Sequence, residues 1–505
     1  MPRLIDLFPE GRRVEAHRPW PRIVVSTEDW RRAAGELEHG RAVLLGLWGD
    51  AGAIHMALVA EAPPEIVVVT CECPEGRYPS VGALHPPAIR LERAIRSLYG
   101  LEAEGLPDAR AWLDLGFWDT ARPLGDASAA PRDKPSYAFL PVEGEGLHQV
   151  AVGPVHAGII EPGHFRFTAN GETVVRLEER LGYVHKGVER LMRGATLEKA
   201  ARLAGRVSGD STVAYALAFA RSVEAALEVA LPPRALHLRA LMAELERLAN
   251  HFGDIGAICN DASFSIMHAQ CGILRERCLR AADTAFGHRL MMDRVIPGGV
   301  AADLDRRGVE SIEALLDEAR RRFPRLVGLY DNTTSLQDRT VGTGRVSPLL
   351  ARLFGAGGYV GRASGRSFDA RKVMGCAPYD RLTFEVPRLE EGDVNARVWI
   401  RIREVEQSLS LVEQILGQLP DGPVRVDLAP SATHFAEGLA LAEGFRGDIL
   451  AYVRFDREAR LAQCHLRDPS WFQWPLLEAA IEGNIIADFP LCNKSFNCSY
   501  SGHDL

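Results

Sequence analysis

The sequence predicts an α+β fold in which a small N-terminal α+β domain precedes a larger domain built around a long-helix bundle with peripheral β hairpins. Two patterns lead to this prediction. Short apolar runs bounded by polar residues are typical of strands, and apolar residues recurring every three or four positions over long segments are typical of amphipathic helices. With 505 residues, the chain is too long for one ordinary core, so we expect roughly two to four domains.

Residues 1–120 are predicted to form the N-terminal α+β domain. Two apolar runs, Arg41–Leu47 and Glu65–Thr70, predict strands. The segment Ile89–Tyr99 predicts a helix, because its apolar residues lie on or near one helical face. Residues 121–147 are rich in Pro, Ala and Asp and show little periodicity, which predicts a linker that crosses a surface between two packed domains.

Residues 148–505 are predicted to form the larger domain. Its first element is a hairpin, because Asn170-Gly171 supplies the two positive φ angles of a tight turn between two apolar segments. Long helices with one apolar stripe are predicted onward from Leu238 and over Val398–Leu416. Three later strands complete the expectation: Val424–Leu428, Ile449–Phe455 and Arg460–Leu466.

Composition narrows the class of protein. Hydrophobic residues make up 47% and charged residues 25%, as in ordinary globular proteins, and a net charge of −8 argues against a general nucleic-acid binder. The N-terminus lacks a basic region followed by an apolar core, and no run reaches the ~18 apolar residues of a membrane helix, so we expect a cytoplasmic protein. The nine cysteines include no C-x-x-C pair, the commonest mark of a zinc or iron–sulfur site.

Several blocks of sequence, in a constant order from residue 150 to the end, resemble one family, the large subunits of complex I and of group 4 membrane-bound nickel–iron hydrogenases. The resemblance is closest to the hydrogenase-4 and formate hydrogenlyase large subunits. It implies a hydrogenase large-subunit-like fold for residues 148–505. The blocks are Gly153–Phe167, Leu181–Leu191, Glu244–His251, Ile296–Ala301, Arg339–Gly344, Gly361–Gly365 and Arg467–Phe472.

The N-terminal domain carries a second resemblance. Tyr78-Pro-Ser80, Leu91-Glu-Arg93, Tyr99-Gly-Leu101 and Leu106-Pro-Asp108 resemble the small hydrophilic subunit that complex I places beside its large one. In group 4 hydrogenases this domain is often fused ahead of the large subunit, as here.

The family resemblance implies a nickel–iron site held by two cysteine pairs, and this chain lacks most of it. The first pair falls in Arg206-Val-Ser-Gly-Asp-Ser211, where serines Ser208 and Ser211 replace both cysteines. The second falls in Asn493-Lys-Ser-Phe-Asn-Cys498, where Ser495 replaces one cysteine and only Cys498 remains. Nickel requires soft, charged thiolates, and Lys494 beside the site opposes a cation. We therefore expect no metal here.

Complex I, which also lacks these cysteines, uses the vacated region for quinone. His156 matches the first of two histidines in that family's loop, but Ile160-Glu-Pro-Gly-His164 is hydrogenase-like at the second. Gly209 occupies the place of a tyrosine that contacts quinone, so quinone chemistry by that route lacks its phenol. Glu161 matches a glutamate that relays protons in hydrogenases.

Each candidate residue has two readings. Glu161 is either a proton relay or a carboxylate that caps a turn before Pro162. His156 either contacts a headgroup or carries protons, or it fixes its loop by a hydrogen bond. His185 and Lys186 could face a partner subunit or, for Lys186, water. Asp210 and Lys494 could form a buried ion pair that replaces the lost metal link, or they are two unrelated charges.

The combined reading is a peripheral subunit of a membrane-associated, complex I-like complex related to energy-converting hydrogenases. Its implied partners are an iron–sulfur small subunit and integral membrane subunits that move ions. We expect no cofactor bound by this chain, an iron–sulfur cluster in the neighbouring subunit, and quinone as a candidate ligand. Two functions are possible for the metal-free chamber. The first is NADH- or ferredoxin-linked electron transfer to quinone, and the second is a scaffold role without chemistry. An active nickel–iron hydrogenase requires the metal and is not expected.

Overall fold

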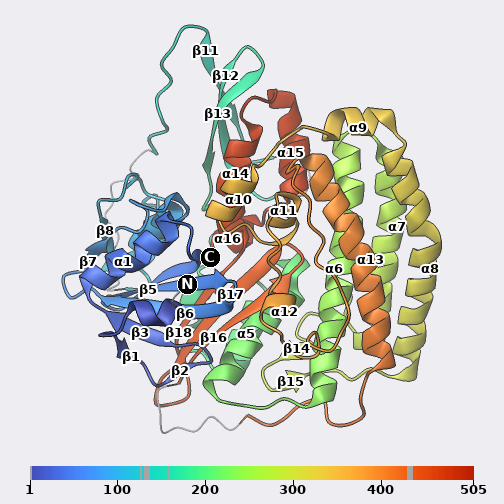
Figure 1. Ribbon diagram of the computed structural model, residues 1–505, viewed down its shortest axis with the longest axis horizontal. Coiled ribbons are helices and arrows are strands. Elements are labelled where there is room, and N and C mark those ends of the chain that lie inside the picture. The colour runs from blue at the N-terminus through green and yellow to red at the C-terminus, as the bar shows by residue number, and fades with distance from the viewer. Residues whose placement is uncertain (1–2, 126–127, 130–136, 157–159, 429–435) are drawn as a thin grey trace.

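The computed structural model describes residues 3–125, 128–129, 137–156, 160–428 and 436–505. The N-terminal domain lies on one side of a C-terminal sheet and the bundle of long helices lies on the other (Figure 1). This mixed architecture confirms the predicted α+β class. Parts of the predicted linker, residues 126–127 and 130–136, lie outside the described residues. Within the described ranges, every helix is too short or too polar to span a lipid bilayer.

The N-terminal domain is a five-stranded sheet, in the order β1-β3-β6-β5-β4, covered by two helices. Helix α2 (Ile89–Tyr99) coincides with the predicted helix, and Gly100 ends it in the left-handed conformation. Both predicted strands are present: the first overlaps β4, which begins two residues later than predicted, and the second lies within β6. The bounds are η1 (Leu4–Leu7), β1 (Arg12–Arg13), β3 (Arg22–Val25), α1 (Thr27–Glu38), β4 (Val43–Asp50), β5 (Ala53–Glu61), β6 (Pro64–Glu72), β7 (Arg77–Pro79), η2 (Pro86–Ala88) and β8 (Glu102–Glu104).

A three-stranded antiparallel sheet projects beyond the N-terminal domain at the start of the second unit (Figure 1). The predicted hairpin is present, but its turn lies one residue later than predicted: Asn170 ends β12 and pairs with Thr173, and of the two predicted turn residues only Gly171 has a positive φ, of 58°. The strands are β11 (Leu147–Val152), β12 (His164–Asn170) and β13 (Thr173–Arg180), and the short pair β9 (Thr120–Ala121) and β10 (Ser128–Ala129) precedes them.

Four long helices, α6, α7, α8 and α13, form the bundle (Figure 1). The two predicted apolar stripes lie on α6 and α13 and are buried against one another, and α6 also packs on α7. The bounds are α3 (Val188–Met192), α4 (Leu197–Ala204), η3 (Gly209–Ser211), α5 (Thr212–Ala226), α6 (Pro233–Asp261), α7 (Ser265–Phe286), α8 (Arg306–Asp331), α9 (Thr334–Thr340), α10 (Pro348–Leu353), α11 (Gly358–Ala363), α12 (Ala370–Val373) and α13 (Val394–Gly417).

The C-terminal sheet has the order β18-β17-β16-β2, and its last strand comes from the N-terminal end of the chain. In β2, His17 pairs in parallel with Glu437. The predicted strand Val424–Leu428 is wrong: Arg425 forms only an isolated bridge with Gly299, because the segment meets a two-residue edge strand. The bounds are β2 (His17–Arg18), β14 (Val295–Ile296), β15 (Gly299–Val300), β16 (Glu437–Gly444), β17 (Gly447–Phe455), β18 (Leu461–Arg467), α14 (Ser470–Ile481), η4 (Ile486–Asp488), α15 (Phe489–Phe496) and α16 (Tyr500–His503).

The N-terminal and C-terminal sheets share a buried interface. Trp48 on β4 stacks on His465 of β18 with ring centroids 5.2 Å apart. The Arg22 guanidinium contacts the Glu437 carboxylate at 2.9 Å, and both side chains are buried. His17 and His55 are buried in the same interface. The two sheets are therefore held together by aromatic packing and by a buried ion pair.

Candidate functional site

Three segments that the sequence singled out meet in one place, which we call the chamber: the β11–β12 loop, the Ser208–Ser211 segment and the tail from Asn493 to Leu505. The Ser499 hydroxyl lies 3.4 Å from the Ser208 hydroxyl, joining the tail to the second segment. The Ser501 backbone N–H donates to the Glu161 carboxylate at 3.3 Å, joining the tail to the loop. Residues 157–159 of the loop lie outside the described residues.

Arg446, in the turn between β16 and β17, spans the chamber. Its Nη2 and Nη1 contact the two carboxylate oxygens of Asp210 at 2.5 and 2.9 Å, and Nη1 also donates to the Ser211 hydroxyl at 3.2 Å. On the other side, its Nε donates to the backbone carbonyl of Asn497 at 2.5 Å. One guanidinium thus ties together the two segments that carry the family's cysteine positions.

Asp210 is held by hydroxyls as well as by Arg446. The Ser208 hydroxyl donates to its carboxylate at 2.6 Å, and the Ser211 hydroxyl does so at 3.3 Å. Burial alone would raise the pKa of Asp210, but attraction to Arg446 and these hydrogen bonds hold it below its ordinary value. Asp210 is therefore an ionised carboxylate at neutral pH.

The predicted ion pair between Asp210 and Lys494 is wrong. Both side chains lie within the described residues, and the Asp210 carboxylate is paired with Arg446 instead of Lys494. Lys494 lies on α15, where its nearby acid is Asp261 on α6. The prediction failed because Arg446 comes from a strand turn that is remote from both segments in sequence.

The second cysteine-pair position is occupied by protein hydrogen bonds. The Ser495 hydroxyl donates to the Cys492 carbonyl at 2.6 Å and accepts from Arg397 Nε at 2.9 Å. The Cys498 thiol is 4.0 Å from the Gln473 amide oxygen, and burial raises its pKa well above the usual value.

These residues do not fit a nickel–iron group. Of the four positions, three hold hydroxyls that are engaged by Asp210, Arg397, Arg446 or a backbone carbonyl, and one holds a neutral thiol. Across the parts of the chain that the structure describes, no three His, Cys, Asp or Glu side chains lie in an arrangement suited to a metal ion.

The remaining predicted residues lie at the edge of the chamber. Arg206 turns outward and forms a two-bond ion pair with Asp293 at 2.6 and 2.7 Å. Gly209 faces open space, since no atom of the described residues lies within 4 Å of where a Cβ would be. Asn493 lies on α15 near the Tyr500 phenol. These positions border the chamber without contributing to the Arg446 bridge.

His156 is placed as its structural interpretation predicts, whereas the contact of Glu161 is with the C-terminal tail. His156 Nε2 is 2.7 Å from the Gly163 carbonyl and so fixes its own loop. Glu161 is exposed and accepts a backbone N–H from the tail. His185 is hydrogen-bonded to the Asp504 carbonyl at 2.9 Å. Lys186 donates to the Val207 carbonyl at 2.8 Å, next to Ser208, so its ammonium supports the chamber rather than facing only water.

Two hollows adjoin the chamber. One of about 90 Å³ lies between α6 and α7 and is lined by Gly209, Asp210, Glu246 and Arg275. The other, of about 440 Å³, is lined by Trp118, Lys186, Leu191 and Leu505 among others. Burial raises the pKa of Glu246 in the first hollow to about 8, although two backbone N–H groups of α5 bind its carboxylate.

Sequence reasoning missed Arg446, Arg397 and Ser499. Arg446 lies 236 residues from Asp210 along the chain, and nothing in its own Gly-rich stretch predicts that contact. Arg397 lies just one residue before the predicted helix Val398–Leu416, and its inward direction could have been read from the helical stripe. Ser499 follows Cys498 directly and carried no signal of its own.

Comparisons with known proteins point to one family. A family model described as the 49 kDa subunit of respiratory-chain NADH dehydrogenase matches residues 262–437. Formate hydrogenlyase subunit 5 of Escherichia coli is 32% identical over 449 residues, which cover 87% of this chain and 79% of that protein. A subunit of the NADH-quinone oxidoreductase of Syntrophobacter fumaroxidans is 29% identical over 69% of this chain and 94% of that protein.

A solved structure agrees with the sequence comparisons. A chain of the membrane-bound sulfane sulfur reductase, described as an archaeal respiratory membrane complex, superposes with a TM-score of 0.67 at 25% identity. The match covers 72% of this chain and 100% of that chain.

Proposed function

Because the chain belongs to the family of complex I 49 kDa subunits and group 4 hydrogenase large subunits, with a fused N-terminal domain, we propose that its chamber works without nickel and iron. The chain would serve as a peripheral subunit of a complex I-like, energy-converting membrane complex. Its partners would be an iron–sulfur subunit and membrane subunits that move ions. The chain itself would carry no metal.

One observation carries this proposal: the Arg446 bridge. A guanidinium bound to Asp210, Ser211 and the Asn497 carbonyl lies between the two segments that a dinuclear metal would join. A fixed positive charge there opposes a metal cation at close range. Ser495, already hydrogen-bonded on both sides, offers no thiolate. The chemistry of the site therefore favours a metal-free chamber.

Metal analysis of the full chain tests the proposal. The chain is produced in a host that loads a nickel–iron hydrogenase large subunit, and that subunit is purified in parallel as the loading control. We expect far less than one nickel per chain, with nickel near stoichiometric in the control. One nickel per chain, retained through gel filtration, would overturn the proposal.

The leading candidate for chamber chemistry is reduction of a quinone or another small acceptor. Two electrons from the neighbouring subunit's iron–sulfur cluster and two protons would convert a quinone to a quinol. The hollow beside Gly209 has only about 90 Å³, against the roughly 300–1,000 Å³ of ordinary ligand pockets. A quinone ring bound in this hollow would therefore need walls supplied by the iron–sulfur subunit.

A scaffold role is the second candidate, and the same Arg446 bridge favours it, because the chain's own side chains fill the space. Turnover of the assembled complex with a water-soluble quinone separates the two. If the chamber binds the acceptor, Arg446→Met lowers turnover at least tenfold while assembly persists, and Arg206→Met, which removes contacts to Asp293 and to the Arg202 carbonyl outside the Arg446 bridge, leaves turnover unchanged. Wild-type turnover by a fully assembled Arg446→Met complex would favour the scaffold.

A further inference from the structure

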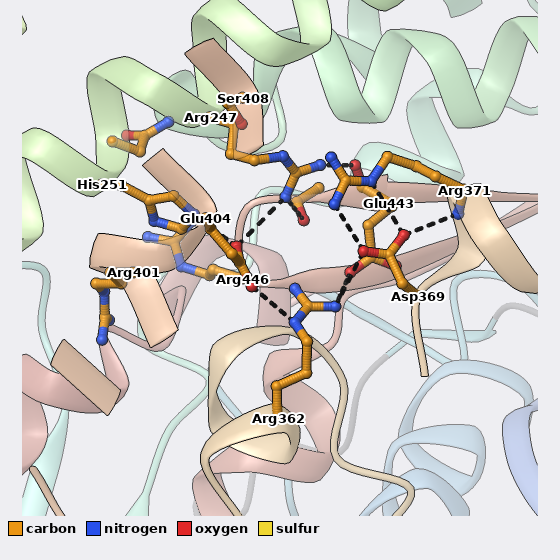
Figure 2. Close-up of polar contacts among 12 residues, drawn as sticks. Arg247, His251, Arg362, Asp369, Arg371, Arg401, Glu404, Ser408, Glu443 and Arg446 are labelled. Atoms are coloured by element: carbon orange, nitrogen blue, oxygen red, sulfur yellow. Dashed lines mark hydrogen bonds and ion pairs between the residues drawn. The ribbon is translucent and has the colours of Figure 1, made fainter. Parts of the chain in front are cut away.

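A group of charged side chains is buried between α6, α11, α13 and β16, close to the Arg446 turn of the chamber. We call it the buried charge cluster. Figure 2 shows how these side chains point toward one another from helices and strands that are distant in sequence. All are at most 6% exposed. The cluster consists of Glu244, Arg247, His251, Arg362, Asp369, Arg371, Glu404 and Glu443.

The charges of the cluster do not balance if every carboxyl is ionised. It contains four carboxyl groups and three guanidinium groups, with one imidazole. The neighbouring arginines cannot supply the missing charge, because Arg446 is paired with Asp210 and Arg401 with Asp254. A net buried negative charge is costly in a low-dielectric interior, so the cluster should hold one additional proton.

His251 is a poor place for that proton. Its Nε2 lies 2.7 Å from a Glu404 oxygen, but its Nδ1 has no hydrogen-bond partner within the described part of the chain. Its ring is packed edge-on against Tyr359 and Phe445. A charged imidazole would bury a second N–H without an acceptor, whereas a neutral ring that donates from Nε2 would not.

Among the four carboxyl groups, Glu443 has the weakest set of cationic contacts. Glu244 and Asp369 each contact two guanidiniums within 3.4 Å. Glu404 contacts Arg362 at 2.7 Å and Arg247 at 4.0 Å, as well as His251. The Glu443 carboxylate contacts one guanidinium, that of Arg362, at 3.0 Å, while Arg247 binds the Glu443 backbone carbonyl at 2.9 Å.

The surroundings of Glu443 add negative charge. Its second oxygen accepts the Ala370 backbone N–H at 2.9 Å. Asp369 and Asp448 face it from the chain before α12 and from β17, while Arg362 and Arg247 face it from α11 and α6. Asp448 is itself paired with Arg467. A carboxyl that is buried between two acids, with one direct cation, favours its protonated form.

We propose that Glu443 is a proton-binding site, which holds the one extra proton of the buried charge cluster in mildly acidic solution and releases it as the pH rises through neutrality. Burial and the neighbouring Asp369 raise the pKa of Glu443 to about 7, which agrees with this assignment. Glu443 lies three residues before Arg446, so the site adjoins the chamber. The role is a property of this chain and does not depend on which acceptor the chamber serves.

Infrared spectroscopy of the full chain tests the site, because a protonated carboxylic acid has a C=O band separate from that of carboxylates. At pH 6 we expect Glu443→Gln to lose one protonated-carboxyl band that shifts in D₂O. In the wild type, this band should fade as the pH is raised through about 7. Other buried acids with raised pKa values, such as Glu246, cancel in the wild-type-minus-variant difference.

Two further variants make the result decisive. Glu224 is buried and bound on both oxygens by Arg239, so Glu224→Gln should leave the protonated-carboxyl region unchanged. Glu443→Asp keeps a carboxyl and should displace the band rather than remove it, which covers the case that Glu443→Gln fails to fold. A difference spectrum without a lost or displaced band in either Glu443 variant, or an equal loss in Glu224→Gln, would overturn the proposal.

Discussion

At the scale of single residues, one guanidinium performs a task that the family resemblance assigns to a metal. Arg446 binds Asp210 and Ser211 on one segment and the Asn497 carbonyl on the other. Its guanidinium also lies 4.5 Å from the centroid of the Phe445 ring. The planar fork of an arginine suits such a bridge because it donates in several fixed directions at once.

Loss of the Asp210 charge should therefore weaken the chain measurably. Breaking a fully buried ion pair costs about 3–5 kcal/mol, but the Asp210 side chain is 34% exposed, so we expect Asp210→Asn to lower the free energy of unfolding by about 2 kcal/mol. Urea denaturation at pH 7 measures the change. Asp293→Asn, which removes the exposed partner of Arg206, is the matched control and should cost less than about 1 kcal/mol.

The size of this stability difference depends on pH. The pKa of Asp210 is lower in the folded chain than in the unfolded chain, so its contribution is complete above about pH 4 and is lost as the pH falls toward the folded value. The difference between wild type and Asp210→Asn should shrink in acid. A difference that stays constant down to pH 3 would contradict the assignment of Arg446 as the partner of an ionised Asp210.

At the scale of elements, helix α5 packs directly on strand β16, and Gly438 makes this close approach possible. A Cβ at residue 438 would lie 1.9 Å from the Ser222 carbonyl oxygen of α5. That oxygen belongs to the backbone and cannot rotate away. The distance between α5 and β16, the strand that leads into the turn with Arg446, therefore depends on a glycine at residue 438.

Gly438→Ala should push α5 away from β16 and lower the free energy of unfolding by roughly 3 kcal/mol, near the upper end for overpacking. Gly417→Ala is the control, because nothing lies within 4 Å of its Cβ position at the end of α13. Alanine there should be neutral or stabilise the helix by about 0.5–1 kcal/mol. Equal thermal midpoints for the two variants would show that α5 can retreat without cost.

Local patterns predicted the long elements because the information lies within each segment. The apolar stripes of α6 and α13 and the hairpin with a turn glycine at Gly171 need no distant partner to be recognised. The strand expected over Val424–Leu428 failed because pairing depends on what lies opposite, here the two-residue β15. Arg446 was missed for the same reason: its partners lie in other segments, and no spacing rule links them.

At the scale of the whole molecule, the interface between the N-terminal domain and the C-terminal sheet contains two buried histidines. His55 Nδ1 is 2.9 Å from the Thr70 hydroxyl, and Nε2 is 3.7 Å from the Asp50 carboxylate. Burial, with Arg22 and Arg454 nearby, lowers the pKa of His55 to about 4, although Asp50 opposes the shift. Burial likewise lowers the pKa of His17 to about 3.

The interface should consequently loosen in mild acid. An unfolded histidine takes up a proton near pH 6.5, so the stability contributed by neutral His55 and His17 is complete above that pH and is lost as the pH falls toward 4. For His55 the loss should reach about 3 kcal/mol. Urea midpoints at pH 7 and pH 4.5 measure it. His55→Gln should flatten the dependence, whereas His148→Gln, at an exposed position on β11, should leave it as in the wild type.

The parallel pairing of β2 with β16 has a consequence for how the chain is made. His17 leaves the ribosome roughly 420 residues before its partner Glu437. At ~5–20 residues per second, the first strand waits for roughly 20–80 s with its edge uncovered. The N-terminal sheet can form all of its strand pairs during synthesis, but the C-terminal sheet cannot, because β16 to β18 are made last. A nascent chain stalled before residue 437 should therefore bind chaperones at its beginning as well as at its growing end.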